Sequence, residues 1–331
     1  MIESLSIRNF KVLREVDLEL KPLTVIVGPN ASGKSSILQA ISLCTSTQTI
    51  PSRDELNLLR SRTSQKEPSI TARIDGADIA IPLELNSSSV SVNRFIALTS
   101  DADGPDDPGM KRWKSVLLDL DPRKLATPSY PKDVSLSLPS DGEGLSSILA
   151  GLQLERPERF SQIVESLRTV VPNLRGVRIG RVLLKPETVG HEILFDMLGA
   201  EGIPARSASH GTLLTLGVLT ALSLNDGPQV VLIDDLERGL HPKAMSNFVQ
   251  QLRGIQNPNL QIVATSHSPY LIDCVEADEV LLTSLDEDGY AIVRPLTDHP
   301  DYAEWKGFME AGEFWSSVGE DWITREKKAT A

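Results

Sequence analysis

The chain has 331 residues, with 33 Lys and Arg against 45 Asp and Glu, so its formal net charge is −12. Hydrophobic residues make up 40% and charged residues 24%, a balance typical of a globular protein with ample core. No stretch approaches the 18 apolar residues of a membrane span, and so acidic a molecule is excluded as a general nucleic-acid coat. The N-terminus lacks the apolar core of an export signal and the two cysteines lie far apart, so we expect a cytoplasmic protein with reduced thiols.

Residues 2–27 hold three short apolar runs that predict strands, over 2–7, 16–20 and 23–27. The third run, LTVIV, is uniformly apolar, which is typical of a strand buried on both faces of a sheet. It leads directly into GPNASGKSS, and the residues SSILQAISL then place apolar side chains at helical spacing. A buried strand, a glycine-containing turn and a helix are therefore expected in succession.

The middle of the chain differs in composition. Residues 45–110 are rich in Ser, Thr, Asp and Pro, and the acidic segment 101–109 lacks EF-hand ligand spacing, so we expect a surface loop there rather than a calcium site. Beyond residue 111 the pattern predicts two helices and a strand, over 144–154, 158–171 and 177–184. Because 45–190 is too long for a structureless loop, we interpret it as an insertion between two halves of one domain.

An α/β pattern resumes after the insertion. A helix is predicted over 212–224, then the buried strand QVVLIDD, a helix from residue 242 and the buried strand LQIVATS. This alternation predicts an α/β fold with a mostly parallel central sheet, antiparallel N-terminal strands and a mixed α/β insertion. The expected divisions are 1–44, 45–190, 191–298 and a C-terminal tail, 299–331.

The segment 28–35, GPNASGKS, fits the phosphate-loop pattern G-x-x-x-x-G-K-[ST]. Backbone N–H groups must converge on a triphosphate, so the turn needs glycines, and the following helix adds the positive end of its dipole. Lys34 would place its charge on the β- and γ-phosphates, and the Ser35 hydroxyl would bind Mg²⁺. The alternative is a strand–helix turn with a chance lysine, which the flanking elements disfavour. The candidate nucleotide-binding residues are Gly28, Pro29, Asn30, Ala31, Ser32, Gly33, Lys34, Ser35 and Ser36.

Two later strands end in polar residues that suit a partner for this loop. Asp234 follows VVLI and is a candidate Mg²⁺ ligand opposite Ser35, while Asp235 could orient or deprotonate the attacking water. A solvated strand end is the alternative for this acidic pair. His267 follows LQIVATS and could hydrogen-bond the γ-phosphate or the water, since ligands bind at the carboxyl ends of parallel strands.

Together these motifs resemble the ABC-type ATPases of the SMC/RecF and OLD-like group, in a small form without a Toprim domain. The opening LSIRNFKVLREVDLELKPLTVIVGPNASGKSSILQAI is similar to that group's N-terminal lobe, LIDDLERGLHP to its Walker B and D-loop, and ATSHSPYLID to its His switch. The segment ARSASHGTLLTLGVLTAL is similar to its signature. The resemblance implies a P-loop ABC-type ATPase head that hydrolyses ATP with Mg²⁺.

In this group two heads face each other across the nucleotide. Carried over, the resemblance implies that Ser209, Gly211 and Thr212 contact the γ-phosphate bound by a second copy of the chain. A helix start is also an anion site on physical grounds. From the residues alone, SASHGT is equally an ordinary helix N-cap, and both interpretations stay open at this level.

The sequence also departs from the group. The group's catalytic Glu corresponds to Asp235, whose side chain is one methylene shorter. Either turnover is expected to be slow, or Glu237 is expected to share the role of the catalytic carboxylate. No Q-loop glutamine can be placed; Gln39 lies within the phosphate-loop helix and is interpreted as structural. His210, beside the signature serine, is assigned no role.

The expected function is an ATP-hydrolysing head that forms a homodimer or higher oligomer around ATP and regulates a separate effector in antiviral defence. A Toprim-like nuclease on another chain is one candidate effector, and no membrane partner is expected. Two alternatives remain open: a repair-type ATPase that binds DNA directly, and a slowly turning nucleotide-dependent scaffold. The basic stretch 168–185 is either a DNA-contacting edge or a solvated sheet edge. The tail aromatics, the tryptophans with Phe308 and Phe314, are expected to pack in the core, with packing onto a partner as the alternative.

Overall fold

The computed structural model of the chain describes residues 1–45, 68–85, 90–92, 96–97, 113–130, 137–185, 188–255 and 257–324. The chain forms two compact units, each built from segments that are distant in sequence. Unit 1 comprises Met1–Ser115, Pro228–Leu236 and Pro258–Ala331, and unit 2 comprises Val116–Gly227 and Glu237–Asn257. Unit 2 thus begins well after residue 45, where the insertion is expected to start. The acidic segment 101–109 lies outside the described residues.

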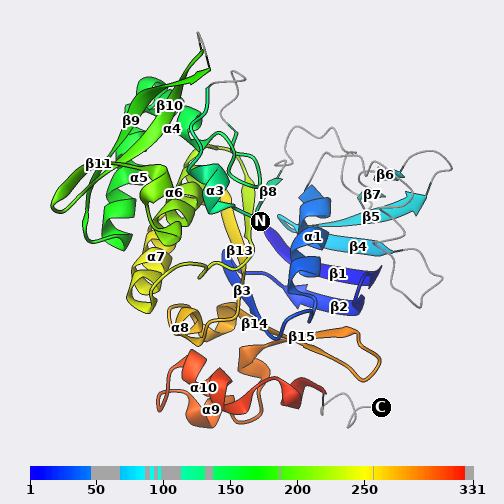
Figure 1. Cartoon of the computed structure of the whole chain (residues 1–331). Coiled ribbons are helices and arrows are strands. Elements are labelled where there is room, and N and C mark those ends of the chain that lie inside the picture. The colour runs from blue at the N-terminus through cyan, green and yellow to red at the C-terminus, as the bar shows by residue number, and fades with distance from the viewer. Residues whose placement is uncertain are drawn as a thin grey trace. The chain divides into compact units, whose positions relative to one another are not determined.

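The first sheet of unit 1 is antiparallel and consists of β1 (Ile2–Phe10), β2 (Leu13–Glu19), β4 (Ser69–Ile74), β5 (Ala77–Leu85), β6 (Val90–Val92) and β7 (Ile96–Ala97) (Figure 1). Its order is β2-β1-β4-β5-β6, with β7 beside β5. The N-terminal strands form as expected because apolar and charged residues alternate; in β2, Leu13, Val16 and Leu18 are buried between exposed neighbours. β4 pairs along β1, so it extends the N-terminal sheet.

The second sheet of unit 1 has the order β15-β14-β3-β13-β12-β8. Its strands are β3 (Leu23–Val27), β8 (Lys114–Leu118), β12 (Gln229–Ile233), β13 (Leu260–Ser266), β14 (Val280–Leu285) and β15 (Ala291–Pro295). β14, β3, β13 and β12 are mutually parallel, whereas β15 is antiparallel to β14. Every residue of β3 and β12 is buried, as their uniformly apolar sequences predict. The predicted α/β fold with a mostly parallel central sheet is confirmed.

A buried glutamine links the two sheets of unit 1. The Gln261 side chain is fully buried on β13; its Oε1 accepts a hydrogen bond from the Ile2 N–H (3.0 Å), and its Nε2 donates to the carbonyls of Ile2 (2.8 Å) and Lys21 (3.1 Å). The amide therefore satisfies backbone groups at the start of β1 that would otherwise be buried without partners. Gln261, a polar residue inside an apolar strand, therefore has a structural role.

The remaining elements of unit 1 are helical. They are α1 (Lys34–Thr45), α8 (Pro269–Ile272), η2 (Ala277–Glu279), η3 (Leu296–Asp298), α9 (Tyr302–Trp305) and α10 (Ala311–Val318). α1 begins at the lysine of the phosphate loop and buries Ile37, Leu38 and Ile41. Among the described residues, no helix has the length and apolar character that crossing a bilayer requires.

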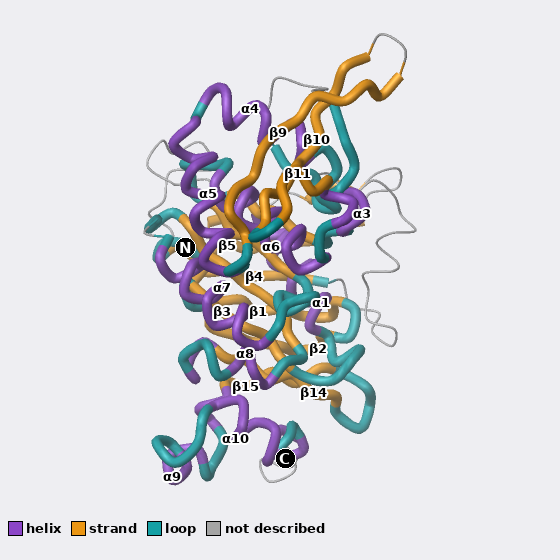
Figure 2. The backbone as a smooth tube through the Cα atoms, turned by 60° about the vertical axis from the view of Figure 1, so that its left-hand side comes forward, coloured by secondary structure: helices purple, strands orange, loops and turns teal. Residues whose placement is uncertain are grey.

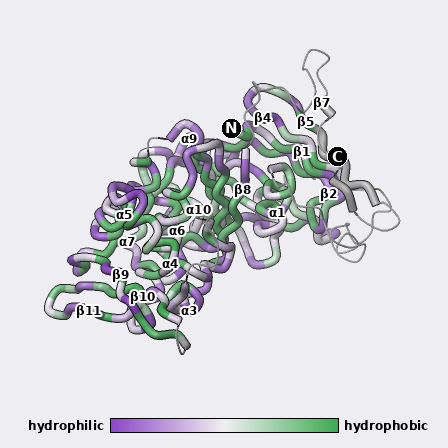
Figure 3. Tube along the Cα trace, turned by 90° about the horizontal axis from the view of Figure 1, so that it is seen from above, coloured by the Kyte–Doolittle hydropathy of each residue, from purple (hydrophilic) through white to green (hydrophobic). Residues whose placement is uncertain are grey.

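The aromatic residues of the C-terminal tail were expected to be buried in the core, and only some of them are. Phe314 and Trp322 are buried, and His299 contacts both rings edge-on, at 5.0 and 4.9 Å between centroids. For Trp305 and Phe308 the expectation is wrong, since they are 43% and 84% exposed. The reason is local: α9 is a single turn and the chain then bends sharply. Figure 3 colours this part of the chain mostly purple, in keeping with its hydrophilic composition.

Unit 2 combines helices with a small antiparallel sheet in the order β11-β10-β9. Its elements are α3 (Pro122–Leu125), α4 (Leu145–Glu155), α5 (Pro157–Val170), β9 (Leu174–Lys185), β10 (Thr188–Met197), β11 (Ala200–Pro204), η1 (Ala205–Ser207), α6 (His210–Ser223) and α7 (Pro242–Gly254). Figure 2 shows β9 and β10 as a long twisted hairpin. α6 is buried on all sides from Gly211 to Leu222, because nearly all its side chains are apolar or small.

Candidate nucleotide-binding and hydrolysis site

The phosphate loop connects β3 to α1, and its conformation requires glycine. Gly28 has φ +150°, and a Cβ there would lie 2.2 Å from the Thr283 carbonyl oxygen of the neighbouring strand β14. Gly33 has φ +103°, a region that side chains rarely adopt. The glycines of the motif thus let the loop turn tightly against β14 and free its N–H groups to converge.

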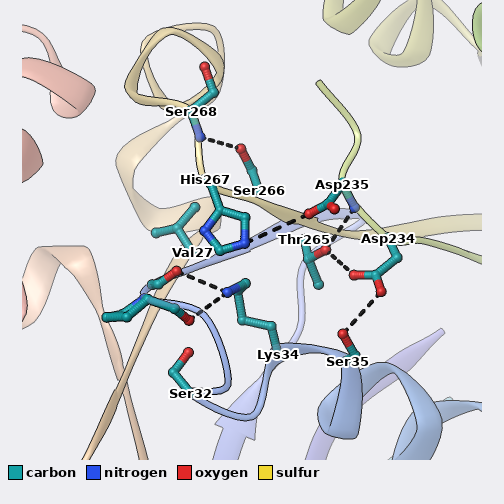
Figure 4. A network of polar contacts seen from close by, with 12 residues as sticks. Val27, Ser32, Lys34, Ser35, Asp234, Asp235, Thr265, Ser266, His267 and Ser268 are labelled. Carbon is teal, nitrogen blue, oxygen red and sulfur yellow. Dashed lines mark hydrogen bonds and ion pairs between the residues drawn. The ribbon is translucent and has the colours of Figure 1, made fainter. Parts of the chain in front are cut away.

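Two side chains of the loop are buried and fixed by hydrogen bonds. Lys34 is 6% exposed, and its Nζ donates to the carbonyls of Gly28 (2.9 Å) and Pro29 (2.8 Å), so the ammonium lies inside the turn (Figure 4). Ser32 Oγ shares a 2.5 Å hydrogen bond with Thr283 Oγ1, which donates in turn to the Val27 carbonyl (3.1 Å). The loop is therefore held in shape by β14 as well as by its own sequence.

The acidic pair meets the loop at the end of β12. Ser35 Oγ donates to Asp234 Oδ2 at 3.0 Å, so the two expected metal ligands are neighbours. The Thr265 hydroxyl, at the end of β13, donates to Asp234 Oδ1 (2.5 Å) and accepts from the Asp235 N–H (2.9 Å). A hydroxyl beside a carboxylate is the hard oxygen donor set that Mg²⁺ prefers, so the residues present fit this cation.

Asp235 and His267 face each other at the mouth of the same site. His267 Nε2 lies 3.8 Å from Asp235 Oδ1, and the two side chains are 39% and 49% exposed (Figure 4). Asp235 has φ +54°, an uncommon conformation for a residue with a Cβ. Lys34, Ser35, Asp234, Asp235 and His267 are thus gathered in unit 1 from three parts of the sequence.

The signature and Glu237 belong to unit 2. Ser209 is the N-cap of α6, with its Oγ accepting from the Thr212 N–H at 3.2 Å, and its side chain is exposed, whereas Gly211 and Thr212 are buried. The helix-cap interpretation of SASHGT is therefore confirmed, and contact with a second copy's γ-phosphate stays a prediction. His210 is exposed beside the cap.

Sequence reasoning missed the two threonines that hold the site together. Thr265 and Thr283 are both fully buried, and each bonds to a motif on a neighbouring element. A hydroxyl within an otherwise apolar strand was the available signal. Gln39, interpreted as structural, accepts a hydrogen bond from Lys11 Nζ, and partial burial lowers the pKa of that lysine.

Two residues of the basic stretch 168–185 are paired with acids. Arg178 on β9 binds Asp196 on β10 through two hydrogen bonds of 2.6 Å, and this holds the pKa of Asp196 below its usual value. Arg168 pairs with Glu165 at 2.9 Å one helical turn away. These pairs neutralise part of the positive charge that the DNA-binding alternative requires. The sequence pattern did not indicate them, because both acids lie outside the run of arginines.

Comparison with known proteins places the chain in a family. A family model described as "AAA domain, putative AbiEii toxin, Type IV TA system" matches residues 23–273. An OLD nuclease from Thermus scotoductus is 24% identical over 347 residues, which cover 88% of this chain and 64% of that protein. A Septu protein PtuA from Bacillus mycoides is 24% identical and covers 87% and 41% respectively. This chain thus spans less than two thirds of either relative.

Solved structures show the same fold. The SMC head bound to the C-winged helix domain of ScpA superposes with a TM-score of 0.59 at 17% identity, over 88% of this chain and 96% of that one. With a family match over more than half of its length, this chain belongs to the AAA-domain family and is an ABC-type, OLD-like ATPase head.

Proposed function

We propose that this protein binds and hydrolyses ATP, dimerises around the nucleotide and thereby regulates a separate effector in antiviral defence. One observation carries the proposal: Thr265 joins the two acids at the end of β12, and one of them, Asp234, is bonded to Ser35 of the phosphate loop. A motif match by chance would not bring Ser35, in the first turn of α1, within 3.0 Å of Asp234 at the end of β12.

Each residue of the site has a defined task in this reaction. ATP with Mg²⁺ supplies the phosphoanhydride bond and the charge neutralisation that make phosphoryl transfer feasible. The backbone N–H groups of the loop 28–36, which Pro29 lacks, bind phosphate oxygens, and the Lys34 ammonium stabilises the charge on the leaving side. Ser35 and Asp234 hold the cation. Asp235 accepts the proton of the attacking water.

Two further groups complete the reaction site. His267 lies beside Asp235 and orients the water or the γ-phosphate, and Glu237 shares the carboxylate role where the shorter Asp235 does not reach. Ser209, Gly211 and Thr212 of a second head bind the γ-phosphate, because the exposed Ser209 offers a hydroxyl at the positive end of α6.

The effector is proposed to be a different polypeptide. One relative is named a nuclease, and the match covers 64% of its length, so about a third of that relative has no counterpart in the match. The ATPase head would then act on the effector by assembling and separating with the nucleotide state. A Toprim-like nuclease on a separate chain is the first effector to test for binding to this protein.

The test measures assembly and hydrolysis together. Lys34→Ala should abolish ATP binding, and Asp235→Asn should bind ATP but hydrolyse it too slowly to separate, so that a dimer accumulates. Sedimentation of Asp235→Asn with and without ATP and Mg²⁺ measures this directly. A monomer under both conditions would refute the two-headed site, and hydrolysis by Lys34→Ala at the wild-type rate would refute the ATPase assignment.

A slow-turnover scaffold is the second candidate, and the length of Asp235 favours it. An aspartate reaches about 1.5 Å less far than a glutamate, and a misplacement of that size costs on the order of 10²-fold in rate. Single-turnover hydrolysis of the wild type and of Asp235→Glu separates the candidates. A faster Asp235→Glu variant indicates that slow use of ATP is built into the native site, whereas a slower one favours an ordinary ATPase.

A further inference from the structure

His267 lies between a well-anchored strand and a very short helix. Before it, Ser266 ends β13 and is fully buried, and its Oγ accepts a hydrogen bond from the Ser268 N–H at 2.9 Å (Figure 4). After it, α8 is a single turn of four residues that begins at Pro269. One helical turn is not stable by itself, because nucleation orders three residues for a single hydrogen bond. The position of α8, and with it that of His267, therefore depends on what packs against this turn.

Both the core and the C-terminal tail contribute to the position of α8. Leu271 and Ile272 are fully buried, so two of its four side chains are fixed in the core. From the tail, α10 packs against α8 (Figure 1). Gly312 of α10 approaches so closely that a Cβ on it would lie 2.0 Å from the Pro269 carbonyl oxygen. Backbone thus meets backbone, with no side chain between the two helices at this point.

A carboxylate closes the same contact. Asp273, the C-cap residue of α8, accepts a hydrogen bond from the Gly312 N–H at 2.6 Å. Gly312 is the second residue of α10, and Glu310, the N-cap residue of that helix, makes no side-chain cap bond within the described part of the chain. Asp273 therefore caps α10 from the neighbouring helix, and its negative charge also complements the positive end of the α10 dipole. The end of α8 and the start of α10 are joined by one side chain.

We propose that Gly312 and Asp273 are positioning residues through which the C-terminal tail sets the place of His267 beside Asp235. A contact between two backbones has no rotamer that could absorb a shift, so a displacement of α10 is passed to Pro269, two residues from His267. When this contact is lost, His267 Nε2 leaves its position 3.8 Å from Asp235 Oδ1, and hydrolysis slows. The phosphate loop between β3 and α1 lies outside this path, so ATP binding persists. This inference rests on the proposed function and gives the tail a part in the reaction.

The first test compares two glycines that lie in helices. Gly312→Ala pushes a Cβ against the Pro269 carbonyl, whereas Gly254→Ala, at the end of α7, adds a Cβ with nothing within 4 Å. Neither glycine has a left-handed φ, so the collision is the difference between the two variants. We expect Gly312→Ala to lose about tenfold in kcat, with affinity for a fluorescent ATP analogue within about threefold of the wild type. Gly254→Ala should keep both values.

A second pair of variants tests the contact without a collision. Asp273 is exposed, so Asp273→Ala removes the hydrogen bond to Gly312 and leaves the core intact. We expect kcat to fall about threefold or more. Asp273→Asn keeps an oxygen that accepts the Gly312 N–H, so it should restore most of the lost rate. This pair decides the question even if Gly312→Ala does not fold.

A double-mutant cycle with His267→Ala shows whether the tail acts through His267. Once His267→Ala has been made, we expect Gly312→Ala and Asp273→Ala to lower kcat no further, while their effects on the urea midpoint stay the same in both backgrounds. Nuclear magnetic resonance gives a measurement that needs no hydrolysis. The ring C–H signal of His267, identified among the five histidines by its loss in His267→Ala, should shift in Gly312→Ala and Asp273→Ala but not in Gly254→Ala.

Three results would each overturn the inference. One is a kcat of Gly312→Ala and Asp273→Ala equal to that of Gly254→Ala, and another is a loss of kcat of the same size with and without the His267 imidazole. The third is an unchanged His267 signal in both tail-contact variants. If the wild type does not hydrolyse ATP, the proposed function fails instead, and the His267 signal still decides whether the tail positions this residue.

Discussion

Replacement of Thr265 by valine tests how the two acids are held. Valine keeps the shape of the side chain but removes the hydroxyl, so Asp234 loses a hydrogen bond to its carboxylate and Asp235 loses the partner of its N–H. A hydrogen bond to a charged group contributes about 1.5 to 3 kcal/mol and a neutral one about 1 kcal/mol, so we expect a loss of about 2 to 4 kcal/mol in the free energy of unfolding. Because both acids are then free to shift by about 1 Å, kcat should fall on the order of 10²-fold.

The assay combines urea unfolding with steady-state ATP hydrolysis, and Thr265→Ser is the matched control. Serine keeps the hydroxyl and removes one methyl group, which costs about 1 kcal/mol of stability in a fully buried position. We therefore expect Thr265→Ser to keep kcat within about threefold of the wild type. Hydrolysis by Thr265→Val at the rate of Thr265→Ser would show that the hydroxyl does not position the acids, and the reasoning would be refuted.

Three further predictions concern other parts of unit 1. Gly28→Ala places a Cβ 2.2 Å from the Thr283 carbonyl oxygen, so it should weaken binding of a fluorescent ATP analogue at least tenfold, and wild-type affinity would contradict the loop geometry. Gln261→Leu leaves the backbone groups of Ile2 unpaired and should lower the free energy of unfolding by about 2 to 4 kcal/mol in a urea titration, whereas an unchanged midpoint would mean that water replaces the amide. Burial raises the pKa of Cys44 to about 12, so iodoacetamide at pH 8 should modify this thiol only after unfolding, and the stability that its neutral form contributes should be lost as the pH rises from 9 toward 12. Peptide mapping separates Cys44 from the partly exposed Cys274, and rapid labelling of Cys44 in the native protein would contradict the prediction.

The sequence was sufficient to predict the parallel sheet and the meeting of the phosphate loop with the acidic pair, because both depend on local patterns. LTVIV and QVVLI are uniformly apolar and can only be strands buried on both faces, and the phosphate loop and the acidic pair stand at their ends. Their meeting at one edge follows from the parallel arrangement alone. The bond between Ser35 and Asp234 was accordingly foreseeable in kind, although not its length.

The supporting residues were not foreseeable, because their partners lie far away in the chain. Thr283 is 251 residues from Ser32, and Gln261 is 259 residues from Ile2, and nothing near either residue indicates which backbone groups they satisfy. The close approach of Gly211 to the Gly239 carbonyl in unit 2 was equally impossible to foresee from the sequence. Gly211 looks like part of a phosphate-binding motif, and only the fold reveals that a carbonyl of its own subunit occupies the space beside it.

The central position of β3 has a consequence for how the protein is made. This strand is synthesised early, yet both strands that flank it, β13 and β14, follow more than 230 residues later. At ribosomal speeds of 5 to 20 residues per second, LTVIV leaves the exit tunnel and waits on the order of 10 to 50 s before a neighbour exists to pair with it. During that interval a short, wholly apolar strand with both edges open is a ready template for aggregation. Recombinant production of this protein should accordingly benefit from slow expression at low temperature and from abundant chaperones, which shield such a segment until its neighbours have been made.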